Sequence, residues 1–191
     1  MQNTRQKILE TANQLFIKKG YTATSIREIA QETGIGKATI YHHFSDKESI
    51  AGALLKIVSD KMMNNLKTIS MVSDPIERLK VAATFSLDAL INSAEIFQIV
   101  RREIPSFKQE FSERMTLFFS SYTSLIKESL EMGMETGLFR KTDAGESARI
   151  FLSMLQGSFA STYITGVKPK STEKLVESLL DVFLNGMRFR N

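Results

Sequence analysis

Apolar residues recur at helical spacing along almost the whole chain. In the first segment Ile8, Ala12, Leu15 and Phe16 share one face, as in an amphipathic helix that covers a core. Long alternation of β-branched and polar residues is absent. The pattern predicts an all-α protein of about nine helices, near residues 3–19, 25–33, 37–43, 46–69, 75–92, 94–102, 105–135, 143–165 and 172–188.

Turn and cap residues mark the ends of the first four helices. Gly20 follows the first helix as a C-terminal glycine, and Thr24 or Ser25 caps the second. Gly34 separates the second helix from the third, and Ser45 caps the fourth. All three prolines of the chain stand just before or at the start of a helical segment, where proline is tolerated.

The composition changes after residues 71–74. Eleven of the 13 phenylalanines lie beyond residue 70. In that part Gly133 and Gly137 are expected to end the long helix near 105–135. We therefore predict two domains, residues 1–46 and residues 47–191, connected by a helix over 46–70.

The last two helices are apolar around much of their circumference. Such a helix needs burial on more than one side, and at the end of a chain a second copy of the protein is a natural partner. Burial in the chain's own core is the alternative. We expect a homodimer whose interface contains Phe151, Leu152, Leu155, Phe159, Leu175, Leu179, Val182 and Phe183.

Residues 25–44 have the pattern of a helix, a tight turn at Gly34 and a second short helix. This arrangement is typical of a helix-turn-helix, whose second helix enters the major groove of DNA. Ile40 and Phe44 face inward, so a role in the core does not easily explain the polar aromatic residues between them. The outer surface of the second helix is expected to carry Lys37, Ala38, Thr39, Tyr41 and His42.

The net charge of +4 lies in the first third of the chain. Residues 1–70 contain 10 Lys and Arg and six Asp and Glu, whereas residues 71–191 contain 15 of each kind. A basic end on a neutral body indicates one anionic partner that docks at that end. An ordinary solvated surface is the alternative for so small an excess.

Segment 4–50 resembles the DNA-binding domain of the TetR (tetracycline-repressor-type) family. The resemblance covers about a quarter of the chain, whereas residues 71–191 match the family only in layout and length. It implies a homodimer in which the first three helices form a DNA-binding head and the last two form a four-helix interface. The residues that carry it are Leu15-Phe16, Gly20-Tyr21, Thr24 to Ala30, Gly34-Ile35, Lys37 to Phe44 and Lys47-Glu48.

The resemblance also implies which residues contact DNA. They are Ser25, Arg27, Lys37, Ala38, Thr39, Tyr41, His42, His43 and Lys47. By side-chain chemistry Arg27, Lys37 and His42 suit base edges, Ala38 offers only a methyl contact, and the others suit phosphate. For His43, packing at the end of its helix is the alternative.

A ligand-responsive repressor of double-stranded operator DNA is the function that the resemblance implies. A small, lipophilic effector would move helix 46–70 and change the separation of the two heads. Met and Phe side chains suit an adaptable apolar pocket, although ordinary core packing is the alternative for each. The expected pocket residues are Met62, Met63, Phe85, Phe97, Phe107, Met115, Phe118, Phe119 and Tyr122, and Arg101 and Arg102 face either this pocket or solvent.

The composition argues against other classes of protein. The chain has no cysteine, which excludes disulfides and cysteine-based metal sites. Its two histidines are adjacent, so the Glu-x-x-His pairs of a di-iron bundle are missing, and no phosphate-binding glycine loop occurs. We therefore expect that the protein is not an enzyme and that it needs no cofactor or metal. We also expect that it is cytoplasmic, with no signal peptide and no membrane partner. A DNA-binding protein of this fold with an architectural or cell-division role is the alternative function.

Overall fold

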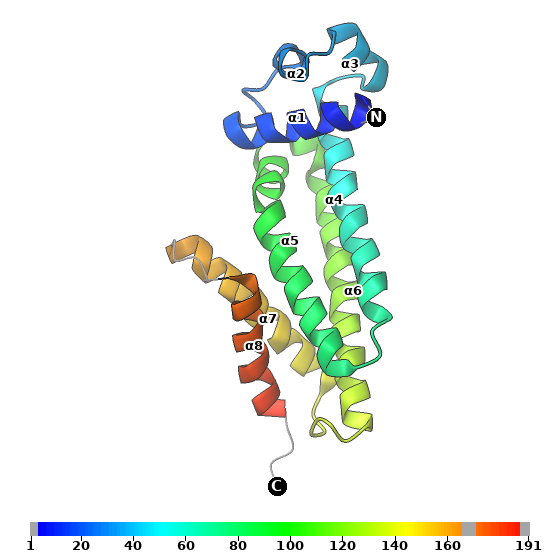
Figure 1. Ribbon diagram of the computed structural model, residues 1–191, viewed down its shortest axis with the longest axis vertical. Helices are drawn as coiled ribbons and strands as arrows, with labels where there is room; N and C mark the ends of the chain where they lie inside the picture. Colours follow the sequence, from blue (N-terminus) through cyan, green and yellow to red (C-terminus); the bar gives the residue numbers. More distant parts are fainter. Residues whose placement is uncertain (1–3, 166–170, 188–191) are drawn as a thin grey trace. The chain divides into compact units, whose positions relative to one another are not determined.

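The computed structural model describes residues 4–165 and 171–187, and every regular element in them is helical. The all-α prediction is confirmed (Figure 1). The elements are α1 Thr4–Lys19, α2 Ile26–Thr33, α3 Lys37–His43, α4 Lys47–Ser70, α5 Pro75–Glu103, the 3₁₀ turn η1 Pro105–Phe107, α6 Lys108–Glu135, α7 Ala144–Thr165 and α8 Thr172–Met187.

The described residues form eight α-helices, not nine, because α5 is continuous. Separate helices were expected near 75–92 and 94–102, but α5 runs through residues 92–94 without a break. That junction contains neither glycine nor proline, and Asn and Ser cost a helix interior only about 0.5–0.7 kcal/mol each. Polar residues alone therefore did not end the helix.

The chain divides into two compact units. The first comprises Met1–Lys61 and Ser93–Met115, and the second comprises Met62–Asn92 and Thr116–Asn191. Helices α4, α5 and α6 each contribute residues to both units. The expected domain boundary between residues 46 and 47 stays a prediction, since the units are defined by packing rather than by function.

The core of the first unit joins the three N-terminal helices to a segment far along the chain. Phe16 of α1, Ile29 of α2 and Ile40 of α3 are fully buried. Ile104, which lies between α5 and η1, is 2% exposed and belongs to the same apolar cluster. Full burial of one such side chain stabilises the fold by roughly 1.5–3 kcal/mol.

The 3₁₀ turn η1 and the start of α6 also pack on this first core. Phe107 and Phe111 are partly buried against the cluster. Gly52 of α4 leaves room for the Phe107 ring, because a Cβ atom there would lie 2.9 Å from its Cζ atom. The segment from Ile104 to Phe111 is therefore part of the structural support of the helix-turn-helix.

The second unit is built around buried aromatic rings. Tyr122 is fully buried, and its ring stacks on Phe118 with 5.7 Å between centroids. The Tyr122 hydroxyl donates a hydrogen bond to the Ala82 carbonyl oxygen at 2.8 Å. Burial raises the pKa of Tyr122 far above its usual value, and a side-chain hydrogen bond with Ser86 opposes part of that shift. The satisfied hydroxyl makes the residue part of the core.

Gly133 lies inside α6 and provides the space that the Phe139 ring occupies. A Cβ atom at Gly133 would overlap that ring. The helix ends later, at Glu135, and Gly137 then adopts a left-handed backbone with φ of 75°. The expectation that both glycines end the helix is therefore wrong for Gly133, whose role is packing.

Candidate nucleic-acid interface

The second helix begins with a complete capping box. The backbone N–H of Glu28 donates to the Ser25 hydroxyl at 3.2 Å, and the Ser25 N–H donates to the Glu28 carboxylate at 2.9 Å. Lys19 also pairs with that carboxylate at 2.8 Å. The hydrogen bond from Lys19, followed by that from the Ser25 backbone, lowers the pKa of Glu28 to about 2. These contacts define where α2 starts.

The turn between α2 and α3 depends on a left-handed residue. Gly34 has φ of 67°, and its N–H points to the carbonyl oxygens of Ala30 and Gln31. The Ile35 N–H donates to Ala30 at 3.0 Å, which completes a Schellman-type ending. A side chain at Gly34 would be strained by its backbone angle.

The third helix exposes the face that the sequence predicted. Ile40 is fully buried and anchors α3 to the core. Tyr41 is 54% exposed, and His43 is only partly exposed. The side chains exposed on this helix are those of Lys37, Ala38, Thr39, Tyr41 and His42. They form one polar surface next to a rigid turn, as a DNA-reading helix requires.

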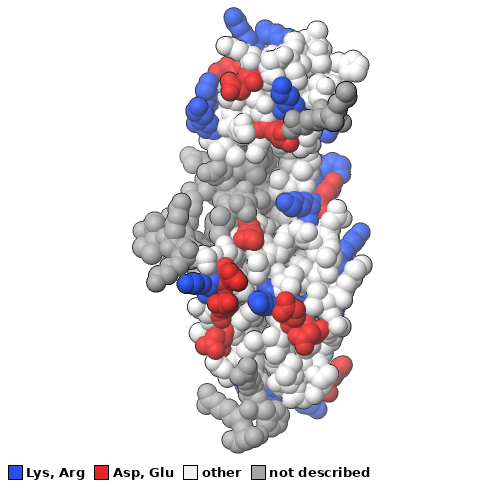
Figure 2. Space-filling model, in the orientation of Figure 1, with Lys and Arg blue, Asp and Glu red and all other residues white. Residues whose placement is uncertain are grey.

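The DNA-contact residues predicted outside α3 differ in whether their polar atoms already form hydrogen bonds within the protein. Arg27 is exposed on α2. Ser25 is exposed as well, but its hydroxyl belongs to the capping box. On the face shown in Figure 2, several Lys and Arg side chains lie at the end that holds α2 and α3, with a few acidic ones among them. Positive and negative side chains are therefore interspersed on this face of the region.

Lys47 is turned toward the protein's own backbone. Its Nζ donates to the carbonyl oxygens of Tyr21 and Thr24 at 2.7 Å each, with Thr22 at 3.4 Å. It also lies 4.2 Å from the centre of the Tyr21 ring. Burial lowers the pKa of Lys47, and the negative charges of Glu103 and Glu28 oppose that shift. The ammonium holds the loop between α1 and α2, a role that the sequence analysis did not foresee.

Sequence reasoning also missed Glu103 as a residue of this region. Its carboxylate accepts a hydrogen bond from the Thr22 N–H at 2.8 Å, although the two residues are 81 positions apart. In the sequence its neighbours Arg101 and Arg102 were connected only with the expected ligand pocket. No local sequence signal connects it with the loop.

The expected ligand-pocket residues fall in both compact units. In the second unit Met62, Phe118 and Tyr122 are buried, Met63 and Phe85 are partly buried, and Phe119 is exposed. In the first unit Phe107 and Met115 are partly buried, and Phe107 packs on the helix-turn-helix core. The side chains of Phe97, Arg101 and Arg102 lie outside the described residues. The predicted pocket as a whole stays a prediction.

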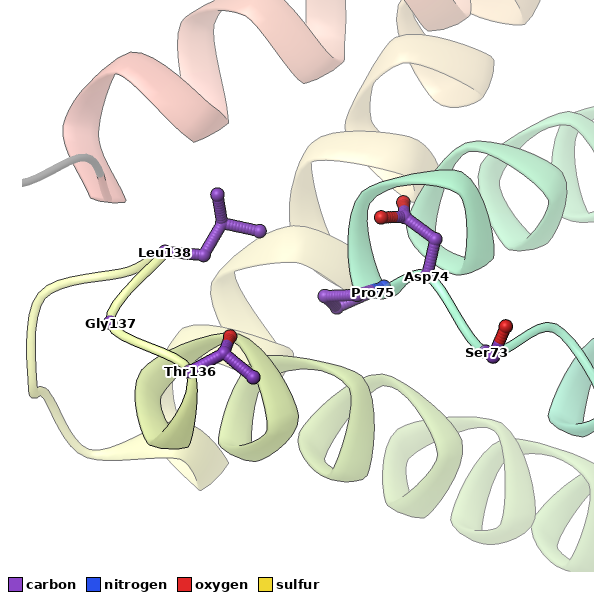
Figure 3. A pocket seen from close by; sticks show the side chains of 6 residues that line it. All are labelled: Ser73, Asp74, Pro75, Thr136, Gly137 and Leu138. Carbon is purple, nitrogen blue, oxygen red and sulfur yellow. The ribbon is translucent and has the colours of Figure 1, made fainter.

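Two surface hollows occur within the second unit. One, of about 600 Å³, lies where Ser73, Asp74 and Pro75 before and at the start of α5 face Thr136, Gly137 and Leu138 after α6 (Figure 3). Asp74 also caps α5 there by accepting the Glu77 N–H at 2.7 Å. The other, of about 450 Å³, lies between α4 and α6 and contains Met63 of the expected pocket set.

The expected dimer residues separate into buried and exposed groups. Phe151, Leu152, Leu155 and Phe183 are buried within the chain itself, and the rings of Phe151 and Phe183 meet edge to face at 5.0 Å. Leu175 and Leu179 are partly exposed, and Val182 is 66% exposed. The Phe159 side chain lies outside the described residues. On α7 Ile150 and Ile164 are also exposed, at 55% and 80%.

Within the described residues, no cluster of three or more His, Cys, Asp or Glu side chains has the arrangement of a metal site. The described helices likewise include none whose length and apolar character would suit a bilayer crossing.

A capped α2, a rigid turn and an anchored α3 with an exposed polar face define a helix-turn-helix DNA-binding protein. Comparison with known proteins identifies its family. Residues 8–54 match the family model described as bacterial regulatory proteins, tetR family, and residues 72–160 match the tetracyclin repressor-like C-terminal domain. The chain belongs to the TetR family of transcriptional regulators.

Individual relatives agree over nearly the whole chain. The HTH-type transcriptional regulator YvkB of Bacillus subtilis is 30% identical over 189 residues, 98% of each chain. The repressor AcnR of Corynebacterium efficiens is 27% identical and covers 93% of this chain and 89% of its own. The TetR-family regulator PfmR of Thermus thermophilus, a crystal structure, is 27% identical with a TM-score of 0.71, covering 95% of this chain and 99% of its own.

Proposed function

We propose that the protein is a repressor that leaves its operator DNA when a small-molecule effector binds. The outer face of α3 is the observation that supports DNA reading: Ile40 is fully buried, while the next residue, Tyr41, is 54% exposed. Because Tyr41 is exposed, its large polar aromatic side chain contributes little to the packing of this seven-residue helix on the core. It is well placed to contact a DNA backbone.

The side chains divide by the chemistry of their contacts. We assign Lys37, His42 and Arg27 to base edges, and Thr39 and Tyr41 to phosphate. Ser25 and Lys47 would share their polar atoms between phosphate and the protein's own backbone, since both already take part in internal hydrogen bonds. Their first contribution is to position α2 and the loop before it.

Repression and effector response are supported by relatives and by the fold. AcnR is named a repressor. Two structures that share the fold are complexes, one with choline and one with stearoyl-CoA, at 24% and 17% identity. At that identity they show only the fold, and their ligands differ greatly in size and charge. We propose a lipophilic effector because of the Met and Phe side chains along α4, α5 and α6.

A homodimer in the cytoplasm completes the proposal. Val182, Ile150 and Ile164 are large apolar side chains left in solvent on α7 and α8. Exposed apolar residues on neighbouring C-terminal helices suit a second copy of the chain. In the proposed interface the buried rings of Phe151 and Phe183 hold α7 and α8 together, while Val182 contacts the partner subunit.

The first test is a salt-dependent titration of the protein against a duplex from upstream of its own gene, with a scrambled duplex as control. Sequence-specific binding predicts a clear preference for the upstream duplex and an affinity that falls steeply as salt rises. Equal, weak binding to both duplexes would contradict the operator assignment and favour an architectural role.

Effector response requires a second measurement on the same complex. A panel of lipophilic and cationic small molecules, with choline and an acyl-CoA included, is added to the protein–operator complex. Release of DNA by one class and not by its polar analogue supports the sensor function. Equal operator affinity with every class of compound would support the DNA-binding protein that senses no ligand.

A further inference from the structure

The loop between α1 and α2 is held from two sides by residues distant in sequence. On one side the Lys47 ammonium, at the start of α4, binds the carbonyl oxygens of Tyr21 and Thr24. On the other, the Glu103 carboxylate, at the end of α5, accepts the Thr22 N–H at 2.8 Å. The loop's acceptors thus meet a cation and its donor meets an anion, the pairing that forms the strongest hydrogen bonds.

Gly20 allows the carboxylate to come this close. It has φ of 87°, which disfavours any side chain. A Cβ atom there would lie 3.3 Å from one Glu103 carboxylate oxygen and 3.4 Å from the other. The backbone therefore passes the carboxylate at a point where only a glycine fits without displacement.

The loop leads directly into the DNA-reading helices. Thr24, the last residue held by Lys47, precedes Ser25, the cap of α2. The Thr24 hydroxyl also donates to the Gly20 carbonyl oxygen at 2.8 Å, so the loop is closed on itself. A shift of this loop would change where α2 begins, and α2 carries the turn and α3 with it.

We propose that Glu103 is a positioning residue for DNA binding: with Lys47 it holds the loop from Gly20 to Thr24 in the form that presents α2 and α3 to the operator. The inference rests on the proposed DNA-binding function. It gives α5 a direct contact with the head, in addition to the connection that α4 makes through the chain.

The sign of the effect separates positioning from simple electrostatics. Glu103 is negatively charged, so its removal should strengthen attraction to DNA if charge alone matters. Positioning predicts the opposite. We expect Glu103→Ala to weaken operator binding on the order of tenfold, because only the fraction of molecules with an ordered loop binds well. Glu103→Gln, which keeps an acceptor for Thr22, should lose less.

The experiment compares full-length wild type, Glu103→Ala, Glu103→Gln and a control, Glu32→Gln, which removes the same charge from the exposed surface of α2. Operator affinity, active fraction by stoichiometric titration and thermal unfolding are measured for each. Hydrogen exchange of the amides in residues 20–25 is measured without DNA. The expected result is weaker binding and faster exchange at this loop for Glu103→Ala at unchanged active fraction, with no loss of affinity for Glu32→Gln.

Two results would overturn the proposal. One is equal or tighter operator binding by both Glu103 variants; the other is unchanged exchange at residues 20–25. Should Glu103→Ala fail to fold, Glu103→Gln decides by the same two readouts. If wild type itself shows no preference for the operator, the proposed function fails. In that case hydrogen exchange at residues 20–25, compared between wild type and the Glu103 variants, still tests whether Glu103 holds the loop.

Discussion

Helix α3 of the first unit and helices α7 and α8 of the second differ in the large side chains that they expose. In the first unit, α3 buries Ile40 and presents Tyr41 and polar neighbours to solvent. In the second unit, α7 and α8 bury Phe151 and Phe183 but leave Val182 two-thirds exposed. A polar face next to basic residues suits a charged nucleic acid, whereas exposed apolar side chains suit another protein surface.

Hydrogen bonds from side chains to loop backbone occur in both units, since Arg78 of the second unit donates to the Ser70 and Val72 carbonyl oxygens, but those of the first unit lie beside the helix-turn-helix. In the first unit Ser25, Lys47 and Glu103 direct their polar atoms at loop backbone, which positions a surface without covering it. In the second, the buried hydroxyl of Tyr122 is satisfied inside the core. The contrast is therefore between polar contacts that position the helix-turn-helix and apolar packing between α7 and α8. Each prediction below challenges one side of this contrast.

The largest effect is expected from Gly133→Ala in the second unit. The added methyl group would overlap the Phe139 ring, and overpacking of a core costs about 1–3 kcal/mol, occasionally more. The gain in helix propensity offsets about 1 kcal/mol of this. Because the overlap is severe, we take the upper end of that range, about 3 kcal/mol, and expect a net loss of roughly 2 kcal/mol in the free energy of unfolding, measured by denaturant titration.

A double variant controls this prediction. Shrinking the ring with Phe139→Leu should relieve the overlap, so the two substitutions together should cost less than the sum of their separate effects. Additive costs would show that Gly133 is required for another reason than space for Phe139.

The next effect concerns the apolar surface of α8. Val182→Asp places a charge where we propose the partner subunit, and a twofold interface contains the substitution twice. We expect the dimer to dissociate at least about tenfold more readily, since burying an unpaired carboxylate is costly. Sedimentation at several concentrations measures this, with Met71→Asp as the matched control because Met71 is 82% exposed on the loop after α4. Equal behaviour of the two variants would remove Val182 from the interface.

The contrast also explains how far sequence could predict each region. Around α2 and α3 the decisive signals are local: a cap at Ser25, a left-handed Gly34 and a buried Ile40. The outer face of α3 therefore followed from spacing alone. The contact of Thr22 with Glu103 spans 81 positions, and no local pattern encodes such a pair.

In the second unit the same limits apply to packing. Gly133 has the sequence character of a helix end, yet it serves as a space for Phe139 inside α6. Apolar periodicity on α7 and α8 showed that the helices need burial, but not which side chains the chain would bury itself. Phe151 and Phe183 were thus placed in the dimer interface together with Val182, although only Val182 stands well out in solvent.

A smaller effect is expected for Tyr41→Ala on α3. Tyr41 is 54% exposed, so its removal should leave the unfolding free energy within about 0.5 kcal/mol of wild type. Loss of its phosphate contact should weaken operator binding roughly tenfold or more, because a hydrogen bond to a charged group contributes about 1.5–3 kcal/mol. Fluorescence anisotropy with a labelled operator duplex and circular dichroism melting measure the two quantities. A matching loss of helical content would instead make Tyr41 a structural residue.

The smallest effect is the acid sensitivity of the α2 cap. Hydrogen bonds from Lys19 and from the Ser25 backbone lower the pKa of Glu28 from 4.5 to about 2 in the folded protein. A lowered folded-state pKa means that the ionised carboxylate contributes stability at pH values above 4.5, and that this contribution is lost as the pH falls toward 2. Thermal unfolding of wild type and Glu28→Gln between pH 6 and pH 2.5 isolates the contribution, because every other carboxylate titrates in both proteins. The wild type should be the more stable above pH 4.5, and the difference should shrink steadily below it. A difference that stays constant over the whole range would mean that the Glu28 carboxylate caps α2 through its shape and not its charge.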